Sequence, residues 1–199
     1  SFSYYCGFKV NSGEYKLMGL APYGKPIYSN KIKEHLIDIK DDGTFKLDMS
    51  YFKFHRGFRM TSKKFHKLFG EKPRTNETKL KSFHMDIASS IQSVTEEIVI
   101  KLAKSLKKET GIKKICLAGG VALNCVANGK LLRKKIFEDI WIQPASGDAG
   151  SALGAALICW HEYLNKPRKI NNYDSMKGAY LGCNFPNSEI ISYLEKIKA

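Results

Sequence analysis

Apolar and polar residues alternate most regularly in the middle of the chain, where the pattern predicts a long amphipathic helix over residues 83–110. Apolar side chains recur there at steps of three and four residues: Ile87, Ile91, Val94, Ile98, Leu102 and Leu106. A basic last turn and Gly111 follow, which is a common way for a helix to end. We therefore expect this helix to stop at about residue 110.

Beyond Gly111 the pattern changes to short apolar runs, each followed by a turn of small residues and a helical pattern. It predicts, in order, a strand at 112–117, a helix at about 123–135, a strand at 139–143 and a helix at about 150–164. Because a helix connects the two strands, we expect them to be parallel members of one sheet.

The two ends of the chain are less regular. Residues 1–26 predict two helices followed by a loop that Pro22, Gly24 and Pro26 keep from being helical. The remaining expectations are a hairpin at 41–54 around the turn Asp42-Gly43, a short helix at 61–69, a polar connector at 71–79, an irregular segment at 165–186 and an amphipathic helix at about 187–198.

The composition is that of a globular protein, with 199 residues of which 43% are hydrophobic and 26% charged. No apolar run reaches the roughly 18 residues that a membrane span needs, and the first residues do not resemble a signal peptide. These features predict a cytoplasmic protein. The first residue is not Met, and we expect the chain to be a piece of a longer protein.

The net charge of +14 suggests an anionic partner, such as a nucleic acid, a membrane surface or a small anionic ligand. The lysines are spread over many segments and alternate with acidic residues, as where Glu97 precedes Lys101 by one helical turn. This distribution disfavours a dedicated nucleic-acid surface.

The cysteines do not form a C-x-x-C pair, which argues against a metal site made of thiolates. Three of them, Cys116, Cys125 and Cys159, stand among apolar residues. We expect them to be reduced and buried thiols.

A glycine pair follows the strand predicted at 112–117. The stretch "GGVALN" places Gly119, Gly120 and Val121 in a turn, with Asn124 near the start of the next helix. Ligands of α/β sheets bind at the carboxyl ends of strands, and glycine lets a ligand approach the backbone closely. The N–H groups at a helix N-terminus favour phosphate. The turn is therefore a candidate phosphate site.

A second small-residue turn, "SGDAG", follows the strand predicted at 139–143 and contains Gly147, Asp148 and Gly150. Asp148 is the only acidic residue between Asp139 and Glu162. A carboxylate beside phosphates usually requires a metal ion between them. The two turns together therefore favour a site for a nucleotide and a metal ion.

A purely structural interpretation of both turns stays open. The glycine pair of the first turn then serves only a tight bend, and Asn124 and Asp148 are helix caps. Gly150 and Gly154 then serve close packing of the following helix.

Five stretches of the sequence carry a resemblance to a known family. They are "GEYKLMGLAPYGKP", "MDIASSIQSVTEEIV", "KKICLAGGVALNCVANGKLL", "IWIQPASGDAGSALGAAL" and "GAYLGCNFPNSEI", in this order. Together they closely resemble the nodulation-type and antibiotic-biosynthetic O-carbamoyltransferase family, from Gly13 to about Ile190.

The resemblance implies an α/β fold, namely the second half of an actin/Hsp70/sugar-kinase-like (ribonuclease H-like) ATPase domain, over residues 1–165. Residues 166–199 would be a linker and the truncated start of an adenylate-forming domain. In this family carbamoyl phosphate and ATP give carbamoyladenylate, and the carbamoyl group passes to a hydroxyl of a sugar or natural-product acceptor. The family uses a metal, Fe²⁺ by resemblance, with Mg²⁺ as the other candidate.

The resemblance also assigns residues. Asp148 resembles the carboxylate metal ligand of the family, but the two histidines that accompany it in an H-x-x-x-H helix are missing, so no histidine is assigned. The nucleotide-binding positions would be Gly119, Gly120, Val121, Asn124, Gly147, Glu14 and Lys16. The segment at 19–23 would flank the pocket, although Met18, Leu20 and Tyr23 are also explained as core residues. No catalytic residue or general base is assigned.

Two other functions remain. One is a different actin-like enzyme that phosphorylates its acceptor and needs no carbamoyl phosphate. The other is a non-catalytic scaffold or nucleic-acid-binding module, whose binding would depend steeply on salt. On the first interpretation the chain alone is expected to be inactive, because the N-terminal half of the domain and the adenylate-forming domain are missing.

Overall fold

The structure is a computed structural model that describes residues 1–75, 78–170 and 173–198. The chain divides into two compact units, Ser1–Ile142 and Gln143–Ala199, each described here by itself. The first unit is a mixed α/β structure with two small sheets, one antiparallel and one parallel. No helix of the described residues is long and apolar enough to cross a membrane.

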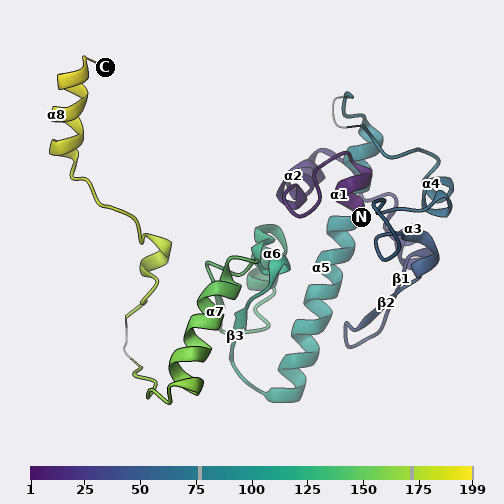
Figure 1. The fold of residues 1–199 in the computed structure, drawn as a ribbon. Helices are drawn as coiled ribbons and strands as arrows, with labels where there is room; N and C mark the ends of the chain where they lie inside the picture. The colour runs from purple at the N-terminus through teal and green to yellow at the C-terminus, as the bar shows by residue number, and fades with distance from the viewer. Residues whose placement is uncertain (76–77, 171–172, 199) are drawn as a thin grey trace. The chain divides into compact units, whose positions relative to one another are not determined.

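Helix α5 (Ser82–Thr110) is the longest element, and most of the other helices of the first unit pack along it (Figure 1). It confirms the helix predicted at 83–110, and Gly111 ends it in the left-handed conformation with φ 67°. Its partners toward the N-terminus are α1 (Phe2–Tyr5), α2 (Glu14–Leu20), the 3-10 turn η1 (Ala21–Tyr23) and α3 (Ser29–His35). The first two helices were predicted, whereas α3 was not. The loop predicted after them begins with η1, because Pro22 is tolerated in the first turn of a helix.

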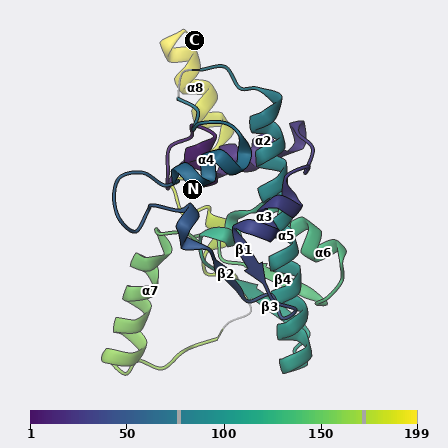
Figure 2. The ribbon, with the colours of Figure 1, turned by 90° about the vertical axis from the view of Figure 1, so that its right-hand side faces the viewer.

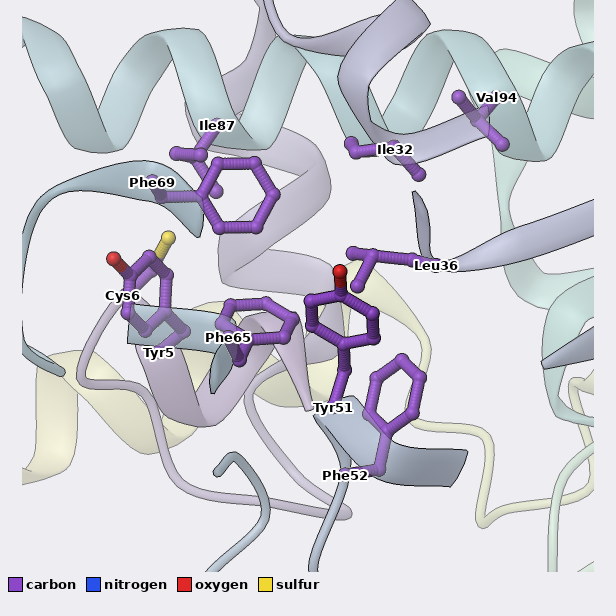
Figure 3. Packing of buried hydrophobic residues seen from close by; sticks show 10 residues of the cluster. All are labelled: Tyr5, Cys6, Ile32, Leu36, Tyr51, Phe52, Phe65, Phe69, Ile87 and Val94. Carbon is purple, nitrogen blue, oxygen red and sulfur yellow. The ribbon is translucent and has the colours of Figure 1, made fainter. Parts of the chain in front are cut away.

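An aromatic core joins these N-terminal helices to α4 (Lys63–Phe69) (Figure 3). Tyr5 and Phe65 are almost fully buried, and their rings meet edge to face with centroids 4.9 Å apart. The Ser62 hydroxyl accepts a hydrogen bond from the Phe65 N–H and so caps α4. This helix confirms the one predicted at 61–69.

The predicted hairpin exists around the predicted turn, but only its second strand lies within residues 41–54, because its first strand ends before residue 41. Strand β1 (Ile37–Ile39) pairs antiparallel with β2 (Phe45–Leu47), and the turn contains Gly43 at φ 90°. After β2 the chain leaves the sheet, because the Asp48 carboxylate accepts from the Ser50 N–H and starts the 3-10 turn η2 (Met49–Tyr51). The connector predicted at 71–79 has no helix or strand in its described part, and residues 76–77 lie outside the described residues.

The parallel sheet consists of β3 (Lys114–Leu117) and β4 (Asp139–Ile142), which confirms the predicted parallel arrangement. Between them come the 3-10 turn η3 (Gly120–Leu123) and helix α6 (Cys125–Arg133). One face of the sheet packs into a core with α5 and α6 (Figure 2); its buried members are Ala103, Ile115, Leu131 and Phe137.

The expectation of buried thiols is wrong for Cys116, Cys125 and Cys159, which are exposed free cysteines. Side chains of a strand alternate between faces, so Cys116 points away from the face that buries its neighbour Ile115. Among the cysteines, which all lie in the described residues, only Cys6 is buried, and burial raises its pKa to about 12.

The second unit contains α7 (Gly150–Ile158), which continues as a π-helical turn η4 (Cys159–Tyr163). The 3-10 turn η5 (Lys177–Ala179) and helix α8 (Asn187–Ile197) follow. These elements confirm the helices predicted at 150–164 and 187–198. Between them the described residues are irregular apart from η5, as predicted, and residues 171–172 lie outside the described residues.

Candidate functional site

The turn after β3 depends on the backbone conformation of Gly119. This residue has φ 96° and ψ 161°, a region that is essentially restricted to glycine. Its carbonyl accepts from the Ala122 N–H at 2.9 Å, and the Val121 carbonyl accepts from the Asn124 N–H at 2.9 Å. The tight bend that the glycine pair predicts is therefore confirmed.

Three consecutive N–H groups of this turn, those of residues 119–121, have no hydrogen-bond partner within the described part of the chain. All three residues are exposed. A Cβ atom placed on Gly120 would meet nothing within 4 Å, so neither packing nor strain accounts for this glycine. Consecutive free N–H groups before a helix are a suitable place for an anion such as a phosphate.

Asn124 is the N-cap of α6. Its side-chain oxygen accepts from the Ala127 N–H at 3.0 Å, and its side-chain amide also pairs with Gln92 of α5. The helix-cap interpretation of Asn124 is thus confirmed. A direct contact between Asn124 and a ligand stays a prediction.

The turn after β4 has a different construction. The carbonyls of Gly147 and Asp148 accept from the N–H groups of Gly150 at 3.0 Å and Ser151 at 3.1 Å. The N-cap of α7 is Ala149 and the helix has no side-chain cap, so the structure does not support Asp148 as its cap. The Asp148 side chain is exposed.

Two further residues of this turn, Gly150 and Ser146, lie close to other atoms of the chain. A Cβ atom on Gly150 would overlap the carbonyl oxygen of Ala145, which confirms that Gly150 serves close packing. A Cβ atom on Gly154, farther along α7, would meet nothing within 4 Å, so the packing role expected of Gly154 is wrong. Ser146 is buried, and its hydroxyl has no hydrogen-bond partner among the described residues. A buried hydroxyl without a partner is uncommon and marks a place where a further polar group is expected.

The segment around α2 lies beside the first turn, because the sulfur atoms of Met18 and Cys125 are 4.0 Å apart. The Glu14 carboxylate accepts from the N–H groups of Asn11 and Gly13, both at 3.1 Å, and so closes the loop before α2. The Lys16 ammonium is exposed and lies 6.0 Å from the centroid of the Tyr15 ring.

The core interpretation of this segment holds only in part. Leu20 is buried and Met18 half-buried, but Tyr23 is 75% exposed. The nucleotide-binding roles of Glu14 and Lys16 stay predictions.

The described residues do not contain a group of three or more His, Cys, Asp or Glu side chains that could hold a metal ion. Two histidines are used in local structure: His66 bonds the Thr61 hydroxyl at 2.9 Å, and Nδ1 of His84 accepts from the Lys81 N–H at 3.0 Å. Desolvation lowers the pKa of both imidazoles. Within the described residues of the two glycine turns, Asp148 supplies the one carboxylate that a metal ion could bind. A metal ion at this place would need further ligands.

The comparison with protein families settles the affiliation of the chain. Residues 1–157 match the family described as carbamoyltransferase N-terminus. The chain belongs to this carbamoyltransferase family. The match covers the whole first unit and the second glycine turn.

Several relatives are substantially longer than this carbamoyltransferase-family chain. An uncharacterized protein of Synechocystis sp. is 57% identical over 98% of the chain, which spans 32% of that protein. The nodulation protein NolNO of Sinorhizobium fredii is 41% identical over 75% of the chain and 20% of its own length. The nodulation protein NolO of Bradyrhizobium diazoefficiens is 38% identical over 77% of the chain and 26% of its own length. The chain thus spans about a third or less of these relatives.

The sequence interpretation missed one residue next to the first turn, Gln92. It lies on α5, is buried, and bonds the N-cap Asn124. One pattern in the sequence could have pointed to it: Gln92 and Glu96 are polar residues four positions apart, between the apolar positions of one helix face. Buried polar side chains of this kind require partners, which the sequence does not identify.

Proposed function

We propose that this chain supplies the nucleotide-binding part of an O-carbamoyltransferase, with the first turn, residues 118–124, as its phosphate site. The observation that carries the proposal is the set of three free N–H groups at residues 119–121, beneath open space at Gly120. Membership of the carbamoyltransferase family gives the reaction class. The parallel βα units agree with half of an actin-like ATPase domain, which is the fold we propose.

In the proposed reaction, carbamoyl phosphate, ATP and one water give carbamoyladenylate, phosphate and diphosphate. The hydroxyl oxygen of a sugar or natural-product acceptor then attacks the carbamoyl carbon of carbamoyladenylate. The bond from that carbon to the phosphate oxygen breaks, and AMP leaves with the electron pair. N–H groups of the first turn would hold the AMP phosphate and stabilise the charge that develops on it. The acceptor proton passes to a base outside the residues assigned here.

Other residues would complete the nucleotide pocket. Glu14 and Lys16 are proposed to flank it from α2, which the contact between Met18 and Cys125 brings near the first turn. Gly147 is proposed to border it from the second turn. Asp148 would give one carboxylate to a divalent metal, Fe²⁺ or Mg²⁺, whose remaining ligands lie outside the described residues; no step is assigned to that metal.

We further propose that the chain works within a longer protein that supplies the other half of the domain and an adenylate-forming domain. The lengths of the relatives support this arrangement. Residues 166–199 would then form the connection to the adenylate-forming domain.

The test is a calorimetric titration of ATP into the protein made from its complete gene, with and without Fe²⁺ or Mg²⁺. Gly120→Val fills the open space above the turn and is expected to weaken ATP binding at least about tenfold, which is a loss of about 1.4 kcal/mol. Gly57→Val is the matched control, because a Cβ on Gly57 also meets nothing within 4 Å. Equal affinities in the two variants would refute the assigned phosphate site.

Asp148→Ala is expected to remove the metal-dependent part of the binding heat, whereas Asp41→Ala, another exposed carboxylate, should not. Carbamoylation of an acceptor that requires carbamoyl phosphate supports the proposed reaction. Phosphorylation of an acceptor without carbamoyl phosphate would instead indicate an actin-like kinase. Nucleic-acid binding that is indifferent to Asp148→Ala would support the scaffold alternative.

A further inference from the structure

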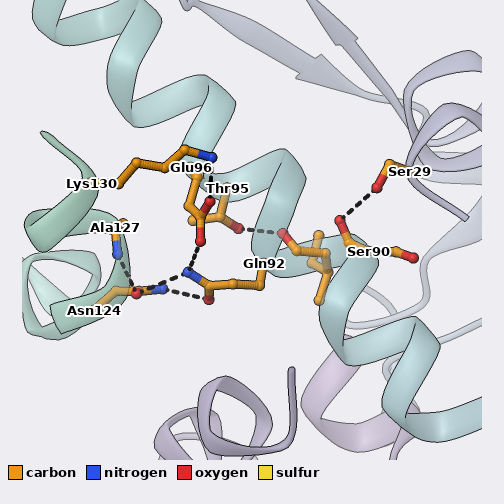
Figure 4. Close-up of polar contacts among 9 residues, drawn as sticks. Ser29, Ser90, Gln92, Thr95, Glu96, Asn124, Ala127 and Lys130 are labelled. Atoms are coloured by element: carbon orange, nitrogen blue, oxygen red, sulfur yellow. Dashed lines mark hydrogen bonds and ion pairs between the residues drawn. The ribbon is translucent and has the colours of Figure 1, made fainter. Parts of the chain in front are cut away.

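A chain of buried and partly buried polar contacts runs from α5 to Asn124 at the N-terminus of α6, the residue that ends the first turn (Figure 4). The Gln92 amide nitrogen donates to the Glu96 carboxylate at 2.9 Å and to the Asn124 side-chain oxygen at 3.1 Å. In return, the Asn124 amide nitrogen donates to the Gln92 oxygen at 2.9 Å. The two side-chain amides therefore form a reciprocal pair between the helices.

Both ends of this chain of contacts have fixed hydrogen-bonding roles. At one end the Ala127 N–H can only donate, so it requires the oxygen of Asn124 to face it. At the other end the Glu96 carboxylate is paired with the Lys130 ammonium at 2.7 Å and accepts from the Gln92 nitrogen. These two ends leave one orientation for the Gln92 amide, whose two N–H groups are then both used.

Burial makes this orientation energetically important. Gln92 and Glu96 are each only 9% exposed, so water cannot easily replace a lost partner. Asn124 is the last residue of the first turn and directly follows Leu123, the last residue of η3. The position of the free N–H groups of residues 119–121 thus depends on contacts made by α5.

We propose that Gln92 is a positioning residue for the phosphate site: through Asn124 it holds the first turn in the conformation that binds the nucleotide. This inference rests on the proposed function and extends it to a residue that touches no ligand. Glu96 fixes the direction of the Gln92 amide, and Lys130 holds Glu96. The proposal predicts that loss of this network weakens nucleotide binding more than it slows the transfer step.

The first experiment uses Gln92→Leu in the protein made from its complete gene, with Thr95→Val as the matched control. The Thr95 hydroxyl bonds the Ile91 carbonyl within α5 and does not touch the turn, so its loss reports on α5 alone. We expect Gln92→Leu to raise both the Kd and the KM for ATP about tenfold, because a buried amide pair is left incomplete. The kcat should stay within about threefold, as for a lost contribution to binding.

Hydrogen exchange of the backbone amides supplies a measurement that does not depend on nucleotide. In Gln92→Leu the Ala122, Asn124 and Ala127 amides should exchange about ten times faster, and in Thr95→Val they should not. Unchanged exchange in Gln92→Leu would overturn the proposal. Faster exchange with unchanged ATP affinity would also overturn it, because the network would then serve folding only.

A second pair of variants keeps the test valid if Gln92→Leu does not fold. Gln92→Glu has nearly the same size but places an acceptor against both Glu96 and the Asn124 oxygen, so we expect a similar loss of ATP affinity. Adding Glu96→Gln restores a donor opposite the new carboxylate and should recover about half of the lost binding free energy. No recovery would contradict the assigned direction of the contacts. Failure of the proposed function is recognised separately, as a wild-type protein that binds no ATP.

Discussion

The turns after β3 and β4 are both built from small residues, but they satisfy their polar side chains differently. In the first turn the Asn124 amide is bonded to Gln92 and to the Ala127 N–H. In the second turn, residues 143–150, the Ser146 hydroxyl is buried without a partner and the Asp148 carboxylate is exposed. The second turn is therefore satisfied only in part: its Gln143 side-chain oxygen accepts from the Ala145 N–H at 3.2 Å, but the Ser146 hydroxyl has no partner in the described part of the chain.

This difference indicates what each turn requires from outside. In the first turn the Asn124 side chain is bonded within its own unit, and among the described residues the N–H groups of 119–121 remain available to a ligand. The second turn offers a buried hydroxyl, that of Ser146, which needs a further polar atom, and an exposed carboxylate, that of Asp148, which is free to bind a cation. We therefore expect substitutions in the first turn to act mainly by changing its backbone conformation. Polar substitutions in the second turn should act mainly by changing the hydrogen-bond and metal partners of its side chains.

The largest effect is expected from Gly150→Ala in the second turn. The new Cβ would overlap the Ala145 carbonyl, and backbone cannot move aside as a flexible side chain can. We expect a loss of about 3 kcal/mol in the local stability of α7, typical of severe overpacking. Hydrogen exchange of the α7 amides measures it.

Gly154→Ala is the matched control in the same helix, because a Cβ at that position meets nothing within 4 Å. It should leave α7 unchanged or stabilise it slightly, since alanine favours helix. Equal exchange in the two variants would mean that the second turn is not closely packed at Gly150.

The next effect is expected from Gly119→Ala in the first turn. No atom obstructs a Cβ there, but φ 96° is unfavourable for alanine, and we expect a loss of about 2 kcal/mol in the free energy of unfolding. Gly120→Ala, which does not have a positive φ, should change stability by less than about 0.5 kcal/mol. Urea unfolding of both variants checks the difference. Two equally stable variants would show that the turn relaxes easily and is not preorganised.

The sequence predicted the helices and strands around the two turns better than the polar contacts within them. The helix at 83–110 and the parallel strands were predictable because apolar periodicity records which face is buried. The pairing of Gln92 with Asn124 was not, since these residues are far apart in the chain and periodicity contains no information on polar partners. The same limit explains the error at Cys116, whose apolar neighbours did not reveal which face of β3 it occupies.

A smaller effect is expected from substitutions of Asn124, which separate its two roles. Asn124→Ala removes both the cap of α6 and the contact with Gln92, and we expect a loss of about 1.5 kcal/mol. Asn124→Asp retains an oxygen for the Ala127 N–H but loses the donor to Gln92, so it should lose less stability than Asn124→Ala. Thermal unfolding measures both. A larger loss in Asn124→Asp than in Asn124→Ala would mean that repulsion near Glu96 outweighs the cap.

The smallest effect on stability is expected from Ser146→Ala, which removes the hydroxyl without a partner. Since no hydrogen bond is lost and a buried polar group disappears, the local stability of the second turn should stay equal or rise by up to about 1 kcal/mol. Ser90→Ala is the matched control: the buried Ser90 hydroxyl donates to the Asp86 carbonyl at 2.6 Å and accepts from the Tyr28 N–H at 3.0 Å. That variant should lose about 2 kcal/mol. Hydrogen exchange of the amides near each serine measures both changes in local stability. A loss at Ser146 as large as that at Ser90 would show that the Ser146 hydroxyl already has a partner in the folded protein. The contrast between the two turns would then disappear.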